Sequence, residues 1–156
     1  GRRKGMPYRI CKTIEVQNGH MLSKHPDHCK FPHGHSRRIE FVLEADSLDD
    51  NDMVCDFKVV KSVIRDYIMC YDHALCVNTK DPHYPVMKKE FGEKIIDFEE
   101  TDPTTEVIAK TVFEAFKKKL EDYKQEENSK YPLRLGVRVL RVRVYETSDA
   151  WAEYSE

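Results

Sequence analysis

The chain has 156 residues, and its 26 Lys and Arg against 28 Asp and Glu give a formal net charge of −2. This length predicts one domain over 1–156, and the charge balance excludes the strongly basic surface that holds nucleic acid or an anionic membrane. No apolar run approaches the roughly 20 residues that cross a bilayer. The five scattered cysteines, with no CxxC pair, indicate free thiols in a reducing compartment. We therefore expect a cytoplasmic protein without nucleic-acid or membrane partners.

Two strands are predicted in the N-terminal part of the chain, after a flexible tail over 1–7. YRICKTIEVQ (8–17) is rich in β-branched and aromatic residues, and SRRIEFVLEA (36–45) alternates apolar with polar positions. The segment between them, 18–32, is predicted to be a loop. Alternation places every second side chain of the second strand on one apolar face. This face comprises Ile39, Phe41, Leu43 and Ala45.

Two amphipathic helices are predicted next. Asp56 can cap a helix over 57–71, and either Asp102 or Thr104 can cap a second helix that ends in a solvated linker. The long segment 74–102 between them is expected to be a loop or an insertion. Each helix has one apolar stripe at helical spacing. The first stripe comprises Phe57, Val60, Ile64, Tyr67, Ile68 and Tyr71, and the second comprises Ile108, Val112, Ala115, Phe116 and Leu120.

The C-terminal part is predicted to form two more strands. In LRLGVRVLRVRVYET (133–147) the apolar positions change parity between Val139 and Leu140, which indicates a bulge or a sheet covered on both faces. A short strand around AWAEY follows. The predicted order is therefore β-β-α-α-β-β, in one α+β domain with an antiparallel sheet.

Five of the 7 histidines lie within 20–35, which is the most unusual feature of the sequence. His33 and His35 are two positions apart, so on an extended backbone both imidazoles point to the same side. His20 can supply a third nitrogen from the neighbouring strand, and three imidazoles leave one position of a zinc ion open, as in catalytic sites. Two alternatives remain open: loop histidines without a ligand, and a structural zinc site that Cys29 closes as the fourth ligand.

Further residues suit proton transfer or ligand binding. Cys29 lies four positions before His33, and a thiol near a dication is expected to hold a thiolate near neutral pH. In the Asp72-His73 dipeptide, the carboxylate can orient the imidazole and raise its basicity. Glu146 lies in an apolar strand, where a carboxylate needs a partner rich in hydrogen-bond donors. Each of these residues also has a plain structural explanation. Cys29 fits a small buried thiol, His73 fits a helix C-terminus, and Glu146 fits a surface salt bridge.

Six motifs in the same order resemble the 6-pyruvoyltetrahydropterin synthase family, which includes the 6-carboxytetrahydropterin synthases. The resemblance extends from about residue 8 to the C-terminus. The motifs are His20, CKFPHGHS from Cys29, MVCDFKVVK (53–61), Asp72-His73, PTTE (103–106) and YET (145–147).

The resemblance implies the tunnelling fold, in which the strands of each subunit join those of two neighbours in a trimeric barrel. Two such trimers would stack into a homohexamer with active sites at the subunit interfaces. The resemblance also implies a role for each matching residue. His20, His33 and His35 would bind Zn²⁺; Cys29, Asp72 and His73 would be catalytic; and Glu146, Thr105 and Glu106 would hold the pterin.

The spacing from Cys29 to His33 resembles the branch of the family that serves queuosine synthesis. This branch implies a zinc-dependent lyase, a 6-carboxy-5,6,7,8-tetrahydropterin synthase that converts 7,8-dihydroneopterin triphosphate and releases acetaldehyde and triphosphate. A 6-pyruvoyltetrahydropterin synthase of biopterin synthesis is the first alternative, and a non-catalytic, zinc-stabilised assembly is the second. The chain departs from the family at VQNGH, before the first zinc ligand. Arg37, Arg38 or a nearby Lys is expected to meet the triphosphate, and the sequence selects none of them.

Overall fold

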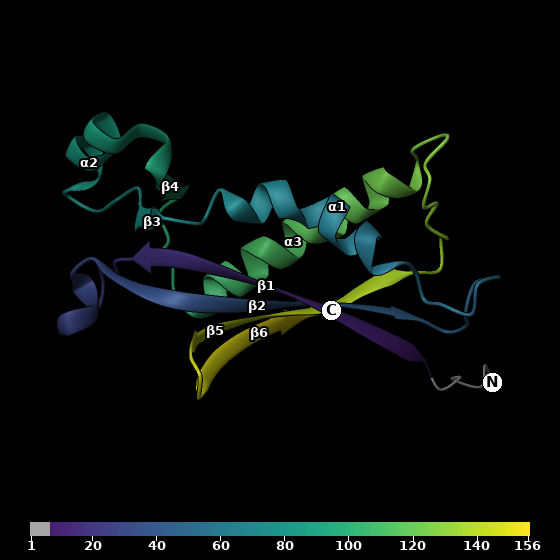
Figure 1. The fold of residues 1–156 in the computed structure, drawn as a ribbon. Helices are drawn as coiled ribbons and strands as arrows, with labels where there is room; N and C mark the ends of the chain where they lie inside the picture. The colour runs from purple at the N-terminus through teal and green to yellow at the C-terminus, as the bar shows by residue number, and fades with distance from the viewer. Residues whose placement is uncertain (1–6) are drawn as a thin grey trace.

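The structure, a computed structural model, describes residues 7–156, so the tail predicted over 1–7 lies outside the described residues except for Pro7. Within this range six strands form one sheet in the order β4-β3-β1-β2-β5-β6, and Figure 1 shows α1 and α3 over one face of it. No helix in this range combines the length and apolarity needed to cross a membrane.

Residues 7–156 form six strands, three α-helices and two short 3-10 turns, η1 and η2. In chain order they are β1 (Tyr8–His20), η1 (His28–Lys30), β2 (His33–Ala45), α1 (Phe57–Met69), β3 (Ala74–Asn78), α2 (Tyr84–Phe91), η2 (Gly92–Lys94), β4 (Ile95–Phe98), α3 (Thr105–Lys124), β5 (Arg138–Thr147) and β6 (Ala150–Ser155).

The two N-terminal strands form a long antiparallel hairpin whose register is unbroken from Tyr8 opposite Ala45 to His20 opposite His33. β1 therefore continues past residue 17, where the sequence predicted a loop to begin. The reason is tertiary, because the end of β1 pairs on its other side with β3. Gly19 permits this approach, since a Cβ atom there would lie 2.9 Å from the Leu75 side chain.

The segment 74–102 is not the loop that the sequence predicted. β3 pairs in parallel with both β1 and β4, and α2 connects the two new strands. The sheet is consequently mixed, and the predictions of a wholly antiparallel sheet and of the order β-β-α-α-β-β were wrong. β3 and β4 are only five and four residues long, too short for periodicity to distinguish a strand from an apolar loop. A small satellite core lies beneath them, comprising Met21, Val77 and Ile95.

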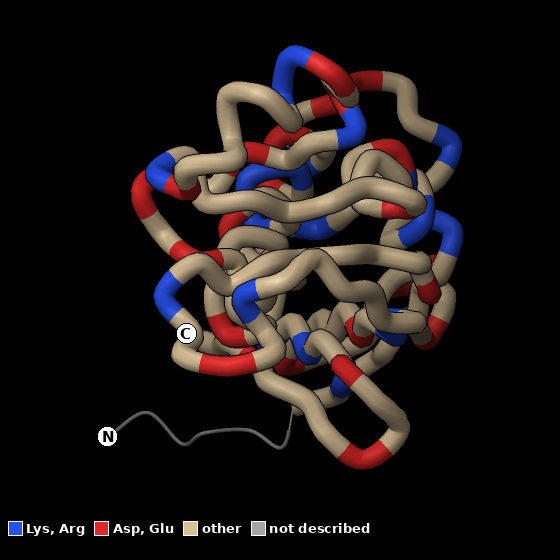
Figure 2. The backbone as a smooth tube through the Cα atoms, turned by 90° about the vertical axis from the view of Figure 1, so that its left-hand side faces the viewer, with Lys and Arg blue, Asp and Glu red and all other residues tan. Residues whose placement is uncertain are grey.

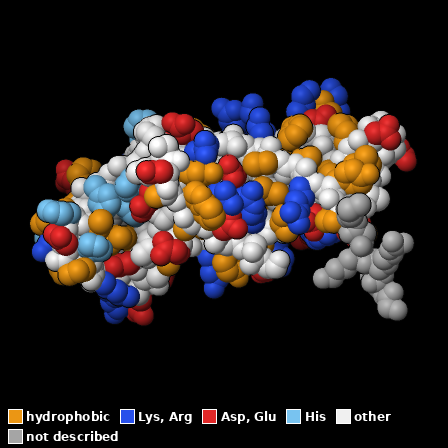
Figure 3. Space-filling view, turned by 90° about the horizontal axis from the view of Figure 1, so that it is seen from below, with side chains coloured by type: hydrophobic (Ala, Val, Ile, Leu, Met, Phe, Trp, Pro, Cys, Tyr) orange, Lys and Arg blue, Asp and Glu red, His pale blue; other side chains and the backbone are white. Residues whose placement is uncertain are grey.

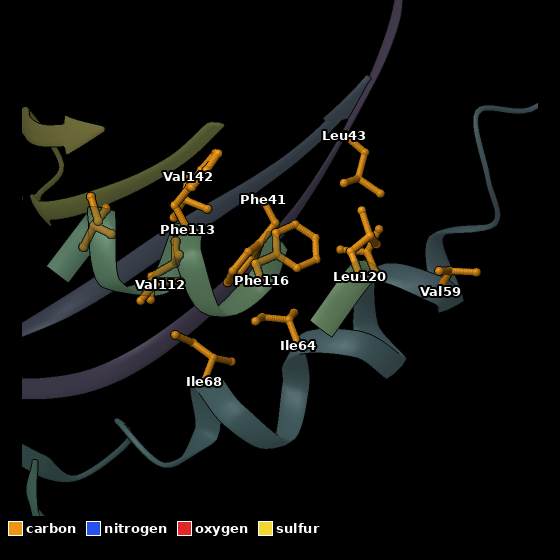
Figure 4. Close-up of a cluster of buried hydrophobic side chains, with 14 of the residues drawn as sticks. Phe41, Leu43, Val59, Ile64, Ile68, Val112, Phe113, Phe116, Leu120 and Val142 are labelled. Carbon is orange, nitrogen blue, oxygen red and sulfur yellow. The ribbon is translucent and has the colours of Figure 1, made fainter. Parts of the chain in front are cut away.

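The main hydrophobic core fills the space between the sheet and the two long helices (Figure 4). Asp56 caps α1 by accepting a hydrogen bond from the Lys58 amide, as predicted. Thr104, rather than Asp102, caps α3 by accepting from Val107. The predicted stripes are largely buried. Labelled core residues in Figure 4 are Phe41, Leu43, Val59, Ile64, Ile68, Val112, Phe113, Phe116, Leu120 and Val142.

Some details differ from the sequence prediction. α1 begins at Phe57 as predicted but ends at Met69 rather than at 71. Phe57, which was assigned to the apolar stripe, is 50% exposed. α3 continues to Lys124 rather than dissolving after Leu120. β5 begins at Arg138 rather than at 133, and the predicted bulge is confirmed: the register with β2 shifts between Val139 and Arg141.

The sheet face opposite the helices is charged rather than apolar. Ion pairs cross it from strand to strand, as where Arg141 lies 3.2 Å from Glu40 and Arg143 lies 2.7 Å from Glu153. Figure 3 views the molecule from this side and shows basic and acidic side chains intermixed, with histidines gathered at one end. Figure 2 shows the same mixture of signs along the backbone. On this face, therefore, basic and acidic side chains lie side by side.

Candidate metal and substrate site

Three histidines come together on the helix-covered face of the sheet, where β1 ends and β2 begins. His20 lies directly opposite His33, and His35 follows two positions along β2 on the same face. The ring centroids are 4.5 to 5.1 Å apart, and His20 Nε2 lies 3.1 Å from His35 Nε2. One nitrogen from each ring can therefore reach a common point, since these atoms all lie within 4.8 Å of one another.

Backbone carbonyls orient two of the three rings. His20 Nδ1 lies 2.7 Å from the Pro103 oxygen, and His33 Nδ1 lies 2.8 Å from the Phe31 oxygen. A carbonyl oxygen only accepts hydrogen bonds, so each Nδ1 must carry the proton and each Nε2 keeps its lone pair. This second contact is the one that metal-binding histidines make through the nitrogen that does not face the metal.

Burial favours the neutral form of His20 and His35, which is the form that binds a metal. His20 is fully buried, and this burial, together with the Arg37 charge and against the Pro103 hydrogen bond, lowers the pKa of the His20 imidazole to about 4. Burial and Arg37 also lower the pKa of His35. Three converging imidazole nitrogens with a fourth position open fit a divalent cation such as zinc.

Cys29 is separate from this histidine cluster. It lies half-buried on the η1 turn, where its carbonyl accepts a hydrogen bond from the Leu22 amide. Among residues 7–156, the group of close metal-ligating side chains consists of the three histidines and does not include Cys29. The geometry therefore favours a site with an open position over the closed four-ligand alternative.

Asp72 and His73 form a hydrogen-bonded pair after α1. His73 Nδ1 lies 2.9 Å from Asp72 Oδ2, and Asp72 Oδ1 accepts from the Gln17 amide at 2.8 Å. The Gln17 and His73 hydrogen bonds lower the pKa of the Asp72 carboxyl, so it is ionised near neutral pH. His73 has a left-handed φ of 56°, and its amide donates to the Gln17 oxygen. The described hydrogen bonds join this pair to β1 and not to the η1 turn or the histidine cluster.

Glu146 reaches the histidine cluster from the end of β5. The Thr105 hydroxyl donates to Glu146 Oε1 at 2.6 Å from the first turn of α3. Burial raises the pKa of the Glu146 carboxyl, but the Thr105 hydrogen bond and the nearby His35 and Arg37 outweigh it, so the net shift is downward. Glu106, the next residue of α3, is exposed and belongs to the acidic first turn of the helix.

Arg37 is a part of the site that the sequence did not single out. Its side chain is 1% exposed, so it cannot meet a triphosphate from solvent. It donates to Asn18 Oδ1 and to Thr105 Oγ1, both at 3.1 Å, and lies 3.2 Å from His20 Nδ1. The alternation of β2 places Arg37 on the face of Ile39, but alternation does not show which residues the guanidinium contacts.

Comparisons with known proteins agree with the resemblance in the sequence. The family model described as 6-pyruvoyl tetrahydropterin synthase matches residues 9–156. The chain is 31% identical to a protein of Aquifex aeolicus named 6-carboxy-5,6,7,8-tetrahydropterin synthase, over 97% of this chain and 99% of that one.

Solved structures show the same fold. An uncharacterised protein of Wolinella succinogenes superposes with a TM-score of 0.77 at 20% identity, covering 97% of this chain and 99% of its own. The 6-pyruvoyl tetrahydropterin synthase of Plasmodium vivax superposes with a TM-score of 0.68 at 12% identity, covering 97% and 98%. The expected α+β tunnelling fold of the subunit is thereby confirmed.

Proposed function

The chain belongs to the 6-pyruvoyl tetrahydropterin synthase family, and on this basis we propose that it is a 6-carboxy-5,6,7,8-tetrahydropterin synthase. The substrate is 7,8-dihydroneopterin triphosphate, and acetaldehyde and triphosphate leave as the side chain is cleaved. The observation that carries the proposal is the convergent histidine cluster in a chain similar to the Aquifex synthase over 97% of this chain and 99% of that one. A cytoplasmic location belongs to the same proposal, since all five cysteines are free.

His20, His33 and His35 would hold the metal, for which we propose Zn²⁺. When bound, zinc supplies Lewis acidity and a template for the hydroxyls of the substrate side chain. The protein's own contribution is to hold one nitrogen of each ring toward one point, with the Nδ1 protons of His20 and His33 engaged by carbonyls. This preorganisation keeps a fourth position available to the substrate.

Proton transfer is assigned to Cys29 and to the Asp72-His73 pair. The ionised Asp72 holds the proton on His73 Nδ1, which leaves Nε2 as the atom that accepts or donates a proton during the reaction. Cys29 would exchange a proton through Sγ from the loop that leads into β2. Within residues 7–156 no hydrogen bond joins Cys29 to this pair. The family resemblance supports a complete site between subunits of a homohexamer.

Glu146 would bind the pterin ring. An ionised carboxylate can accept two parallel N–H bonds from an aminopyrimidinone edge, and Thr105 supports ionisation through its hydrogen bond. Glu106 is proposed to contribute at the helix start, where it is exposed.

Product analysis tests the proposal against its alternatives. Zinc-loaded protein is incubated with 7,8-dihydroneopterin triphosphate, and the products are identified by mass spectrometry. We expect 6-carboxytetrahydropterin, acetaldehyde and triphosphate. Pyruvoyltetrahydropterin would instead establish the biopterin-type reaction, which shares every proposed site residue. Unchanged substrate, together with zinc content of one ion per chain, would support the non-catalytic zinc assembly.

A further inference from the structure

We propose that Arg37 and Asn18 are positioning residues for the substrate site, with Arg37 fixing the Glu146 carboxylate through Thr105. The inference rests on the proposed function, because it takes Glu146 as the group that binds the pterin. It gives a positioning role to the buried Arg37 guanidinium, which has no part in the proposed proton transfer or metal binding.

The first step is the burial of the Arg37 charge. A guanidinium that is 1% exposed has lost nearly all of its hydration, which is costly unless hydrogen bonds and a counter-charge replace the water. Within the described part of the chain, no carboxylate oxygen lies within ion-pair distance of Arg37. The nearest link to a negative charge leads through the Thr105 hydroxyl to Glu146.

The second step is that this link has a fixed direction. Arginine has five N–H donors and no acceptor, so Thr105 Oγ1 must accept from Arg37 Nη1. The single hydroxyl proton of Thr105 is then committed to Glu146 Oε1, at 2.6 Å. This arrangement orients one carboxylate oxygen and favours the ionised form. In the described residues Glu146 Oε2 accepts no hydrogen bond, so it remains available to a ligand N–H.

The third step concerns Asn18, which fixes Arg37 from the other side. The Asn18 side-chain amide donates to the carbonyls of Tyr71 and Ala74, at 2.9 and 3.1 Å, so its own oxygen faces Arg37 Nε. Tyr71 and Ala74 flank the Asp72-His73 pair in sequence. One buried network therefore connects the group that binds the pterin with the turn that carries the proton-transfer pair.

A double-mutant cycle on Arg37→Met and Thr105→Val tests the relay. The probe is neopterin, which carries no triphosphate, and its affinity is measured by fluorescence titration of the full chain, both metal-free and zinc-loaded. We expect each single variant to weaken binding about 10- to 100-fold, the range of a hydrogen bond to a charged group. The double variant should lose no more than the worse single variant, because both substitutions break the same relay.

Arg65→Met is the matched control. Arg65 is an exposed arginine on α1 and belongs to neither the histidine cluster nor the relay from Arg37 to Glu146. This variant should bind neopterin like the unaltered chain, and zinc content should be the same in every variant. If Arg37→Met does not fold, Arg37→Lys replaces it. Lysine keeps the charge, but its compact ammonium is not expected to hold Asn18 and Thr105 together as the rigid guanidinium fork does.

Two results would overturn the positioning role. One is neopterin affinity unchanged by Arg37→Met or, should that variant not fold, by Arg37→Lys. The other is a double variant whose loss is the product of the two single losses, which would mean that Arg37 and Thr105 act independently. Failure of the unaltered chain to bind neopterin is a different result, since it would overturn the proposed function itself.

Discussion

At the scale of single residues, the histidine cluster makes the most direct prediction. His35→Ala removes one of three converging nitrogens, and two imidazoles hold zinc far less well than three. We expect purified His35→Ala to retain less than a tenth of the zinc of the unaltered chain by elemental analysis. His28→Ala is the control, because His28 is exposed on η1 and stands outside the cluster. Equal zinc loss in both variants would argue against the cluster as the ligand set.

The convergence of these histidines could be predicted from the sequence, whereas the role of Arg37 could not. Spacing along an extended strand fixes which side His33 and His35 share, and one cross-strand neighbour completes the set. Arg37 lies on the same face, but a buried arginine is understandable only once Asn18 and Thr105 are known to meet it. Asn18 is 19 positions and Thr105 is 68 positions from Arg37 in the sequence, so no local sequence pattern predicts these contacts.

Glu44 predicts the acid sensitivity of the fold. It is nearly buried, and burial alone would raise its pKa, but hydrogen bonds from Arg9 and Arg138 outweigh this and lower the pKa of the carboxyl below its usual value. Since the folded-state pKa is the lower one, the stabilisation is complete above the unfolded pKa of about 4.3 and is lost as pH falls through the folded value.

Glu44→Gln removes this titration. We expect a lower melting temperature at pH 7 and a shallower decline between pH 5 and pH 3 than in the unaltered chain, measured by circular dichroism. Glu114→Gln, at an exposed carboxylate on α3, should reproduce the unaltered curve. A decline as steep in Glu44→Gln as in the unaltered chain would show that other carboxylates govern acid unfolding.

At the scale of elements, the segment 74–102 is tied to the loop that carries Cys29. Asp102 is nearly buried and accepts from the Lys24 amide at 2.8 Å and from the Asn78 side chain at 3.0 Å. Asp102→Ala leaves the buried Asn78 side-chain amide without an acceptor, which typically costs about 1–3 kcal/mol, and it releases the Lys24 amide. We expect lower stability and faster hydrogen exchange at the Lys24 amide. Asp97→Ala, an exposed acid on β4, should leave exchange at Lys24 unchanged.

The elements that the sequence predicted well are those with long, regular periodicity. β2, α1 and α3 each show a clear apolar face, and the parity change in β5 located its bulge. β3 and β4 were missed because their short apolar runs are stabilised by parallel neighbours from distant parts of the chain. Tertiary pairing, rather than local propensity, decides such strands.

At the scale of the whole molecule, several strand edges lack a neighbour within residues 7–156, among them the outer edge of β4 and the edges of β6 and of part of β1. β6 pairs only with β5, and the part of β1 from Tyr8 to Gln17 pairs only with β2. An unpaired edge offers a row of N–H and C=O groups to another chain. Joining β6 of one subunit to β1 of the next would satisfy both edges and enclose the ion-paired face within a barrel, which supports the proposed hexamer.

Proline substitutions at two successive positions of β6 test this assembly. N–H groups along a strand point alternately to its two sides, and proline has none. Of Ala152→Pro and Glu153→Pro, one therefore removes a donor toward β5 and destabilises the subunit, while the other removes a donor toward the free edge. We expect the unaltered chain to have six times the chain mass by light scattering, and the second variant to remain folded with a smaller mass. If both variants fold and both keep the mass of six chains, assembly through the β6 edge is refuted.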